Sequence, residues 1–175
     1  MFIQNQHIGL RAMEAKDIDL LYAWENNTDL WSVSNAQTPF NRFTLEQFVN
    51  ASHQDIYTNK QLRLMIVSLA NQKTVGTVDL YEFDPQHARS GIGIFIDKSF
   101  RGKGYAKECV DSILKYAFHT LHLKQLHTHV HTSNTASIAL FESCGFEKSG
   151  LKKYWHKTGI NTFEDVWFMQ CYHVA

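Results

Sequence analysis

The sequence predicts an α/β or α+β fold with a mixed, mostly antiparallel sheet flanked by helices. Two stretches, Arg63–Phe83 and Phe146–Cys171, each divide into a pair of strand-like segments around a polar turn, as in antiparallel hairpins. Between them lies a strand–helix–strand unit over Gly91–His131, which is typical of parallel pairing. The 175 residues are enough for one core, and no repeat or linker interrupts them, so a single domain over residues 1–175 is expected.

The N-terminal quarter predicts one strand and two helices. Ile8–Met13 alternates weakly, as in a short strand, and Glu14–Asn26 carries apolar residues at helical spacing. Asn27–Phe43 is irregular. Thr44 and Gln47 form a capping-box pattern that predicts the start of a second helix. Its inner side would hold Phe48, Val49 and Ile56.

The centre of the chain predicts three strands and the longest helix. Arg63–Ala70 and Thr74–Phe83 form the first hairpin, and Gly91–Ile96 is a third strand antiparallel to the second. A helix from about Gly104 to Leu121 follows. Its apolar positions recur every three or four residues and are Ala106, Cys109, Val110, Ile113, Ala117 and Leu121.

The last third predicts a strand, a short capped helix and a closing hairpin. Leu126–His131 reads as a strand, and Thr135–Ser143 as a helix with Asn134 as its N-cap and Gly145 just beyond its end. The hairpin strands would be Phe146–Trp155 and Phe163–Cys171.

Composition excludes several classes of function. Lys plus Arg equals Asp plus Glu at 17 each, which argues against a strong electrostatic grip on nucleic acid or on an acidic membrane. No apolar run approaches the roughly 18 to 20 residues of a membrane span. The three cysteines form no CxxC pair, so a disulfide framework is not expected and a reducing cytoplasm is the expected location.

A basic, glycine-bearing turn joins the Gly91–Ile96 strand to the long helix. Its residues are Arg101, Gly102, Lys103, Gly104, Tyr105 and Ala106. The glycines let the backbone approach a ligand, and free amides at a helix start attract phosphate. The side chains of Arg101 and Lys103 add positive charge. The turn therefore suits a pyrophosphate, although a tight connection with two solvated basic residues is an equally simple reading of RGKG alone.

Two motifs in order and spacing make the sequence resemble the GCN5-related N-acetyltransferase (GNAT) superfamily. RGKGYA resembles its (Q/R)xxGx(G/A) acetyl-CoA signature, and NTASIALFESCGF resembles its NxxAxxLYxxxGF signature. The segments IGLRAMEAKDIDLLYAWEN and VGTVDLYEFDPQHARSGIGIFI resemble the ribosomal-protein-alanine and spermidine acetyltransferase branches. The resemblance covers nearly the whole chain.

This resemblance implies a V-shaped sheet that holds acetyl-CoA as the acyl-donor cosubstrate. The strands before the turn and after the long helix would splay apart, and the pantetheine arm would pair with backbone near Phe95 and Ile96. The amides of Arg101, Gly102, Lys103, Gly104, Tyr105 and Ala106 would bind the pyrophosphate. Asn134 would contact the arm as well as cap its helix, and Phe141 would pack against the cofactor.

The residues for proton transfer depart from the pattern of the family. Similar enzymes often use a tyrosine as the acid where this chain has Phe141, and many carry a glutamate where it has Gly91. His129 stands where some relatives carry another glutamate, and an imidazole suits a base at neutral pH. His129 is thus the candidate base. The alternative is that His127, His129 and His131 simply line a half-polar strand face.

The three alternating histidines do not predict a metal site, because side chains in line along a strand converge poorly on one ion. Direct acetyl transfer without an acyl-enzyme is expected. A binding sensor or pseudoenzyme is the alternative, since Phe141 and Gly91 are both departures.

The acceptor would be the primary amine of a polyamine-like small molecule or of a protein N-terminus, and a homodimer is expected by analogy. Carboxylates and aromatic side chains that suit an ammonium group occur in segments expected near the acceptor. They are Glu25, Asp29, Trp31, Glu46, Asp55, Asp79, Tyr81, Glu82, Trp155 and Asp165.

Overall fold

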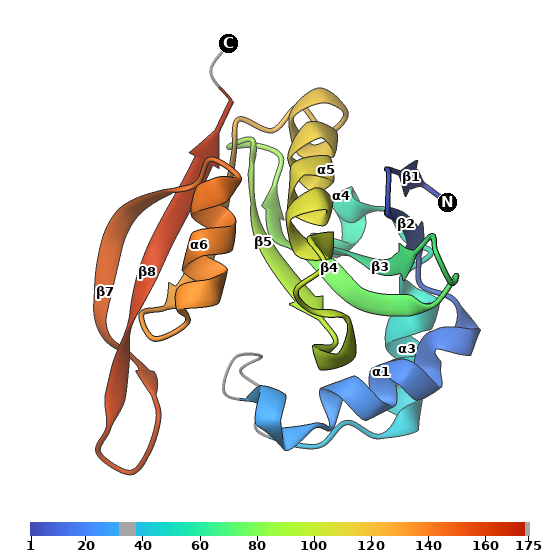
Figure 1. The fold of residues 1–175 in the computed structure, drawn as a ribbon, viewed down its shortest axis with the longest axis horizontal. Helices are drawn as coiled ribbons and strands as arrows, with labels where there is room; N and C mark the ends of the chain where they lie inside the picture. Colours follow the sequence, from blue (N-terminus) through green and yellow to red (C-terminus); the bar gives the residue numbers. More distant parts are fainter. Residues whose placement is uncertain (32–37, 174–175) are drawn as a thin grey trace.

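The computed structural model describes residues 1–31 and 38–173, and within them eight strands form one twisted sheet (Figure 1). The strand order is β1-β2-β3-β4-β5-β6-β8-β7. All neighbouring strands pair antiparallel except β5 and β6, which are parallel. The strands are β1 Ile3–Gln4, β2 Ile8–Ala12, β3 Leu62–Ser68, β4 Thr74–Asp84, β5 Arg89–Ile96, β6 Gln125–His131, β7 Glu147–Lys157 and β8 Phe163–Tyr172.

Helices lie on both faces of the sheet. On one face, α1 (Ile18–Glu25) and α3 (Arg42–Ala51) pack on each other and on the sheet. On the other face, α5 (Tyr105–His119) crosses the central strands and contacts α6 (Thr135–Ser143), which lies beside the β7–β8 hairpin (Figure 1). The short helix α4, Ile56–Asn59, precedes β3.

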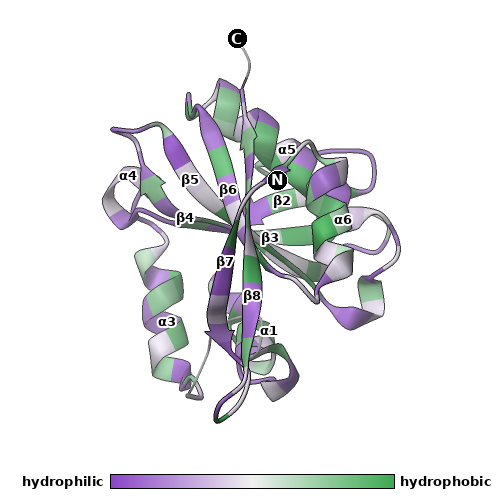
Figure 2. Cartoon of the chain, turned by 90° about the vertical axis from the view of Figure 1, so that its left-hand side faces the viewer, coloured by the Kyte–Doolittle hydropathy of each residue, from purple (hydrophilic) through white to green (hydrophobic). Residues whose placement is uncertain are grey.

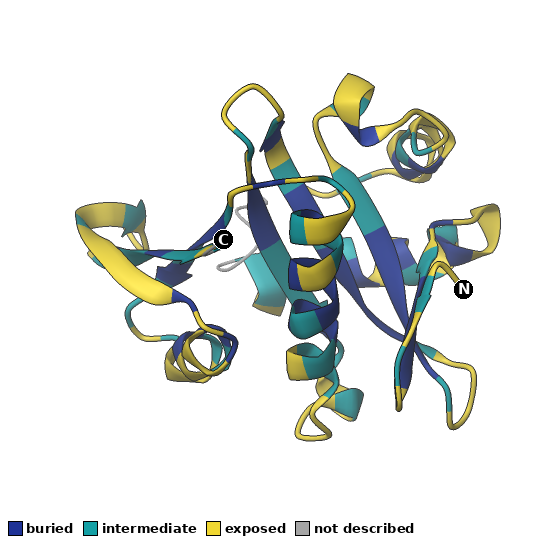
Figure 3. Cartoon of the chain, turned by 90° about the horizontal axis from the view of Figure 1, so that it is seen from above, coloured by how far each residue is buried: buried dark blue, intermediate teal, exposed yellow. Residues whose placement is uncertain are grey.

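The core has two parts, one for each face of the sheet. The larger lies beneath α5, whose inner side buries Cys109, Val110, Ile113 and Ala117 while its outer side stays exposed (Figure 3). This is the helical spacing expected from the sequence. The smaller part joins the two N-terminal helices to β3 through Leu21, Trp24, Leu45, Val49 and Met65.

The parallel pair β5–β6 separates along its length, which creates the V expected from the resemblance. Only Arg89, Ser90 and Gly91 of β5 pair with β6, opposite Gln125, Leu126 and His127. Beyond Gly91, β5 continues to Ile96, and among the described strands it pairs there with β4 alone. The β5 and β6 backbones past the Gly91–His127 pair are therefore free to face a ligand rather than each other.

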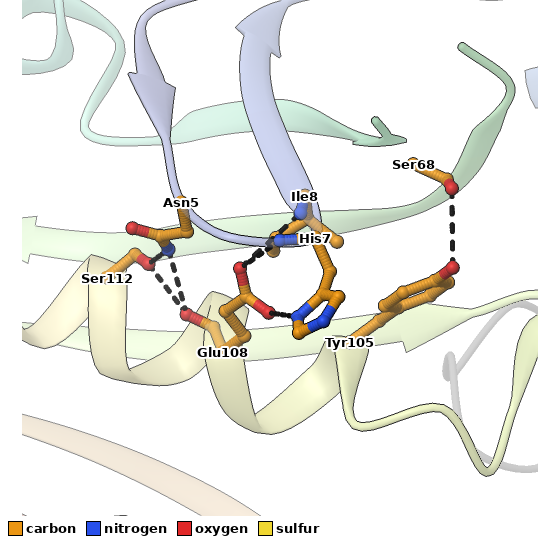
Figure 4. A network of polar contacts seen from close by, with 7 residues as sticks. All are labelled: Asn5, His7, Ile8, Ser68, Tyr105, Glu108 and Ser112. Atoms are coloured by element: carbon orange, nitrogen blue, oxygen red, sulfur yellow. Dashed lines mark hydrogen bonds and ion pairs between the residues drawn. The ribbon is translucent and has the colours of Figure 1, made fainter. Parts of the chain in front are cut away.

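An N-terminal loop clamps the first turns of α5 (Figure 4). Glu108 accepts hydrogen bonds from the backbone N–H of His7, 2.9 Å from Oε1, and from the ring of His7, 3.0 Å from Oε2. Asn5 hydrogen-bonds Ser112 one turn further on. Because a carboxylate near a helix N-terminus also complements the helix dipole, Glu108 fixes the start of α5 in two ways.

Three expectations for the N-terminal region need correction. Asn41, not Thr44, caps α3, because its side chain accepts the Thr44 N–H at 2.8 Å. Ile56 does not continue α3, which ends at Ala51; Ile56 opens α4, with Asp55 as its cap. The helix expected over 14–26 begins only at Ile18, after a 3₁₀ turn over residues 15–17. Of the irregular segment, residues 32–37 lie outside the described chain.

Candidate active site

A cleft of about 930 Å³ opens where β5 and β6 separate. Its walls come from the β5 end, the turn after it, the start of α5, the outer half of β6 and one side of α6. The cleft continues to the other face of the sheet, where α1, β3 and β4 line it. Two chambers, one on each face, thus meet at the gap between the two strands.

The turn at 101–106 has the backbone geometry expected of an anion site. Gly102 and Gly104 have φ of 76° and 78°, in the left-handed region that favours glycine, and no atom lies within 4 Å of a Cβ placed on either one. Gly104 is the N-cap of α5. The first amides of a helix have no partner within the helix, so those after Gly104 point into the cleft with the positive end of the dipole.

Basic side chains surround this turn. Arg101 Nε donates to the Ile96 carbonyl at 2.9 Å, so its guanidinium is held at the end of β5. Lys103 lies over the Phe100 ring at 5.5 Å, and Lys107 pairs with Asp111 at 2.7 Å. All three basic residues line the cleft. An anion bound by the helix start would therefore meet a positive field as well as backbone donors.

Tyr105 and Ala106 offer backbone rather than side-chain groups. The Tyr105 hydroxyl lies 3.3 Å from Ser68 Oγ on β3, so its ring points along the sheet (Figure 4). Ala106 packs against the core. Both residues line the cleft.

The remaining predicted cofactor residues lie on both sides of the gap. The Phe95 ring packs on Trp24 of α1 with ring centroids 5.0 Å apart, Ile96 is buried, and both Phe95 and Ile96 line the cleft. Asn134 caps α6, as expected, by accepting the Ser137 N–H at 3.1 Å. Phe141 is 2% exposed and packs edge-to-face on Phe146. The structure thus brings all of the predicted cofactor residues to one cleft.

The chamber on the α1 side contains a charge network that the sequence did not reveal. Arg63 on β3 donates to Glu25 of α1 and to Asp79 of β4, both at 2.6 Å, and its guanidinium lies over the Phe48 ring. Burial opposes the charge on Arg63, but the two carboxylates outweigh it and raise its pKa. Asp29 lines the same chamber, whereas Glu46, Asp55, Glu82, Trp155 and Asp165 do not.

The three strand histidines have different partners. His129 and His131 line the cleft, whereas His127 is buried, 3.7 Å from Glu82. His131 Nδ1 pairs with Glu164 at 3.2 Å, and His129 Nε2 lies 2.6 Å from Lys152 Nζ. Burial lowers the pKa of His129, and the Lys152 charge lowers it further, so the imidazole is neutral near neutral pH.

Tyr81, one of the residues expected near the acceptor, lines the cleft, but its contact with Gly91 was not predicted. It pairs with Gly91 across β4–β5, and its ring fills the space that a side chain at Gly91 would occupy. Burial raises the pKa of Tyr81 to about 12, so its hydroxyl keeps its proton at neutral pH. Only the missing side chain at position 91 could have signalled this arrangement.

The fold and the cleft together define an acyl-CoA-dependent transferase. A family model for the acetyltransferase (GNAT) domain matches residues 7–147, so the chain belongs to this family. GNAT acetyltransferases use acetyl-CoA, which confirms the expected cosubstrate and the expected N-acetyltransferase activity at the level of the family.

Among curated relatives, the spermidine N(1)-acetyltransferase of Vibrio cholerae is 30% identical over 147 residues, covering 83% of this chain and 82% of the relative. A putative ribosomal N-acetyltransferase of Bacillus subtilis, YdaF, is 25% identical, covering 83% and 81%. A crystal structure of the Vibrio cholerae spermidine N-acetyltransferase in complex with CoA and spermine has a TM-score of 0.86 and 26% identity, covering 96% of both chains. Among the described helices of the present chain, none is long and apolar enough to cross a membrane.

Proposed function

We propose that this acetyltransferase transfers the acetyl group of acetyl-CoA directly to a primary amine of a small, polyamine-like cation. The supporting observation is that positively charged side chains gather at one end of the cleft and carboxylates gather at the other. Arg101, Lys103 and Lys107 stand at the turn on one side, whereas Glu25, Asp29 and Asp79, with Arg63 among them, line the other side. An anionic donor and a cationic acceptor would thus enter from opposite ends.

The donor would bind through the predicted cofactor residues. The amides of residues 101–106 would take the pyrophosphate at the start of α5. The pantetheine arm would lie along the free edge of β5 by Phe95 and Ile96, with Asn134 and Phe141 on the α6 side. The Asn134 side chain uses its oxygen for the cap, so its NH₂ group remains as a donor.

Direct attack fits the thiols of this chain better than an acyl-enzyme does. Burial raises the pKa of Cys144 to about 11 and raises the pKa of Cys109 even more, so neither forms a thiolate readily. In the direct route, the amine nitrogen bonds to the thioester carbon, the C–S bond breaks, and the amine proton passes to a base. His129 is the proposed base in its neutral form.

A polyamine is favoured over a protein N-terminus because the chamber on the α1 side, the acceptor chamber of this proposal, presents several carboxylates. Spermidine and spermine carry several ammonium groups, whereas a peptide N-terminus carries one. The relatives named for spermidine support the same class of acceptor. The alternative acceptor is the N-terminus of a ribosomal-type protein. The expected homodimer and the expected cytoplasmic location stay predictions.

The test compares acceptors under identical conditions. Thiol release from acetyl-CoA is followed with spermidine, spermine, hexylamine and a short peptide with a free N-terminus. We expect kcat/KM for the polyamines to exceed that for hexylamine by about tenfold or more, as one extra charge-assisted contact provides. Preference for the peptide would overturn the polyamine assignment. Tight acetyl-CoA binding without turnover on any amine would instead support the sensor.

A further inference from the structure

Tyr81 lies on β4 directly before a β-bulge. The β4–β5 register runs regularly to the Tyr81–Gly91 pair and then shifts, so that Asp84 faces Arg89. Glu82, next to Tyr81, has φ of 50°, a left-handed conformation that costs a non-glycine residue energy. Ser90 Oγ donates to the Tyr81 carbonyl at 2.9 Å. Bulges are often found beside functional sites, and this one directly follows Tyr81.

The Tyr81 ring occupies the place of a side chain on β5. A Cβ on Gly91 would lie 2.2 Å from Tyr81 Cε2, and one on Gly93 would lie 3.8 Å from Cε1. Position 91 therefore accepts only glycine while Tyr81 keeps this rotamer. Gly91 is also the last β5 residue that pairs with β6. The ring thus lies at the narrow end of the V.

The far side of the ring reaches β6. The Thr128 side chain approaches the Tyr81 hydroxyl and acts against the rise of its pKa, and the His127 ring lies 6.1 Å from the Tyr81 ring, edge-on. Tyr81 and Thr128 both line the cleft. The ring therefore bridges the two strands at the point where they part and closes the cleft there.

The acyl group of the donor would point at this closed end. With its pyrophosphate at the turn after β5, the pantetheine arm would run back along β5 from Ile96 toward Gly91. Five residues of strand cover about 16 Å. The sulfur and its acyl group, at the far end of the arm, would then lie at the level of Gly93 and Gly91.

We propose that Tyr81 sets the length of the acyl group that this enzyme accepts, by closing the narrow end of the V over Gly91. An acetyl group fits in front of the ring, whereas each added methylene would press against it. The inference rests on the proposed donor orientation and adds the residue that confers selectivity for acetyl-CoA over longer acyl-CoAs.

The test compares acetyl-CoA with butyryl-CoA, in binding and in turnover, for the natural protein and three variants. Tyr81→Ala removes the ring that closes the cleft, and Tyr81→Leu replaces it with a shorter apolar side chain. Tyr81→Phe is the matched control, because it keeps the ring and removes only the hydroxyl. Affinity is measured by calorimetry with each thioester alone, and turnover by thiol release with spermidine.

We expect Tyr81→Ala to raise the butyryl-to-acetyl ratio, in affinity and in kcat/KM, by about tenfold or more, since a methylene in a tight pocket is worth 10- to 200-fold. Tyr81→Leu should give a smaller rise, and Tyr81→Phe should keep the ratio of the natural protein within about twofold. An unchanged ratio in folded Tyr81→Ala and Tyr81→Leu would overturn the proposal.

The two proposals fail in different ways. If the natural protein binds acetyl-CoA but acetylates no amine, the proposed function fails, and the affinity ratios still decide the role of Tyr81. If polyamines are acetylated and the ratios do not move, only the role of Tyr81 fails. A natural protein that binds butyryl-CoA as tightly as acetyl-CoA would also contradict it.

Discussion

Lys152 Nζ lies 2.6 Å from His129 Nε2, across β8 from the strand that carries the histidine. An ammonium group has no lone pair, so Nε2 accepts and the imidazole proton resides on Nδ1. The same ammonium lies 4.4 Å from the centre of the Trp155 ring. Lys152 therefore holds His129 neutral but occupies the nitrogen that a base would use, and it has to move before Nε2 can take a proton.

Replacing Lys152 by Met should change the pH dependence of catalysis. The pKa of His129 is lowered first by burial and then by the Lys152 charge, so Lys152→Met should raise this pKa part of the way back. A base works in its neutral form, so the rate falls as the pH drops through its pKa. The acidic limb of kcat/KM should therefore move to higher pH in the variant.

The control for this experiment is Lys153→Met, an exposed change at the next position of β7. It should leave the acidic limb in place. His129→Ala should remove the limb. If neither Lys152→Met nor His129→Ala alters the profile, His129 is not the base.

The turn before α5 should not tolerate a branched side chain at Gly104. Valine strongly disfavours the φ of 78° found there, so Gly104→Val would realign the amides that face the anion. We expect the affinity for acetyl-CoA to fall about tenfold or more, as measured by calorimetry. Gly150→Val on β7 is the matched control, since nothing lies within 4 Å of its Cβ position and its φ is not positive. Equal affinities in the two folded variants would refute the phosphate role of the turn.

Asp29 should contribute to binding the cationic acceptor but not the donor. It lines the acceptor chamber, and none of the ion pairs of the described residues includes it. Asp29→Asn should raise the KM for spermidine several-fold, leave that for acetyl-CoA unchanged, and lose most of its effect at high salt. Glu46→Gln, an exposed change outside the cleft, should alter neither constant. If Asp29→Asn leaves the KM for spermidine unchanged, the acceptor does not bind beside Asp29.

The ion pair between partly buried Arg11 and buried Asp17 should stabilise the fold in a pH-dependent way. Arg11 donates twice to Asp17, both at 2.7 Å, and Asp17 is 3% exposed. Burial opposes ionisation of Asp17, but the hydrogen bonds from Arg11 and from the Glu14 N–H outweigh it and keep its pKa below the ordinary value. Because the folded pKa is lowered, this stabilisation is present above about pH 4 and is lost as the pH falls further.

Asp17→Ala should therefore lower the free energy of unfolding at pH 7 by about 1–3 kcal/mol, since it leaves a partly buried guanidinium without its partner. Urea denaturation at pH 7 and at pH 3 measures the difference, which should shrink at the lower pH. Asp19→Ala is the control, because Asp19 is exposed and pairs with Arg42 at the surface. A cost that is the same at both pH values would contradict the role of the ion pair.

Local signals in the sequence predicted the elements that carry the cofactor turn. Asn134 and Gly145 bound α6 as their residue types suggest, with Gly145 at φ of 88°. The amphipathic spacing of α5 and the strands on either side of it were also predicted within a few residues. These features depend on neighbours in the chain. The V-shaped gap was predicted from the family resemblance that the two motifs carry.

Contacts between distant residues were not predictable in this way. Arg63 and Glu25 are 38 positions apart, and nothing in either segment signals their pairing. Lys152 meets His129 only because β8 lies between their strands. The short strand β1 and the Asn41 cap were missed because a two-residue strand has no period and Thr44 offered a competing cap. Figure 2 shows why β7 could be predicted only by its place in a hairpin, since its residues are largely hydrophilic.

The most direct test of the central claim is a single reaction followed by mass spectrometry. Purified protein is incubated with acetyl-CoA and spermidine, and the amine product and the released CoA thiol are quantified together. The account predicts monoacetylated spermidine in a one-to-one ratio with free thiol, and a lower yield of both in Gly104→Val when acetyl-CoA is below saturation. Thiol release without an acetylated amine, or product formation unaffected by Gly104→Val, would contradict it.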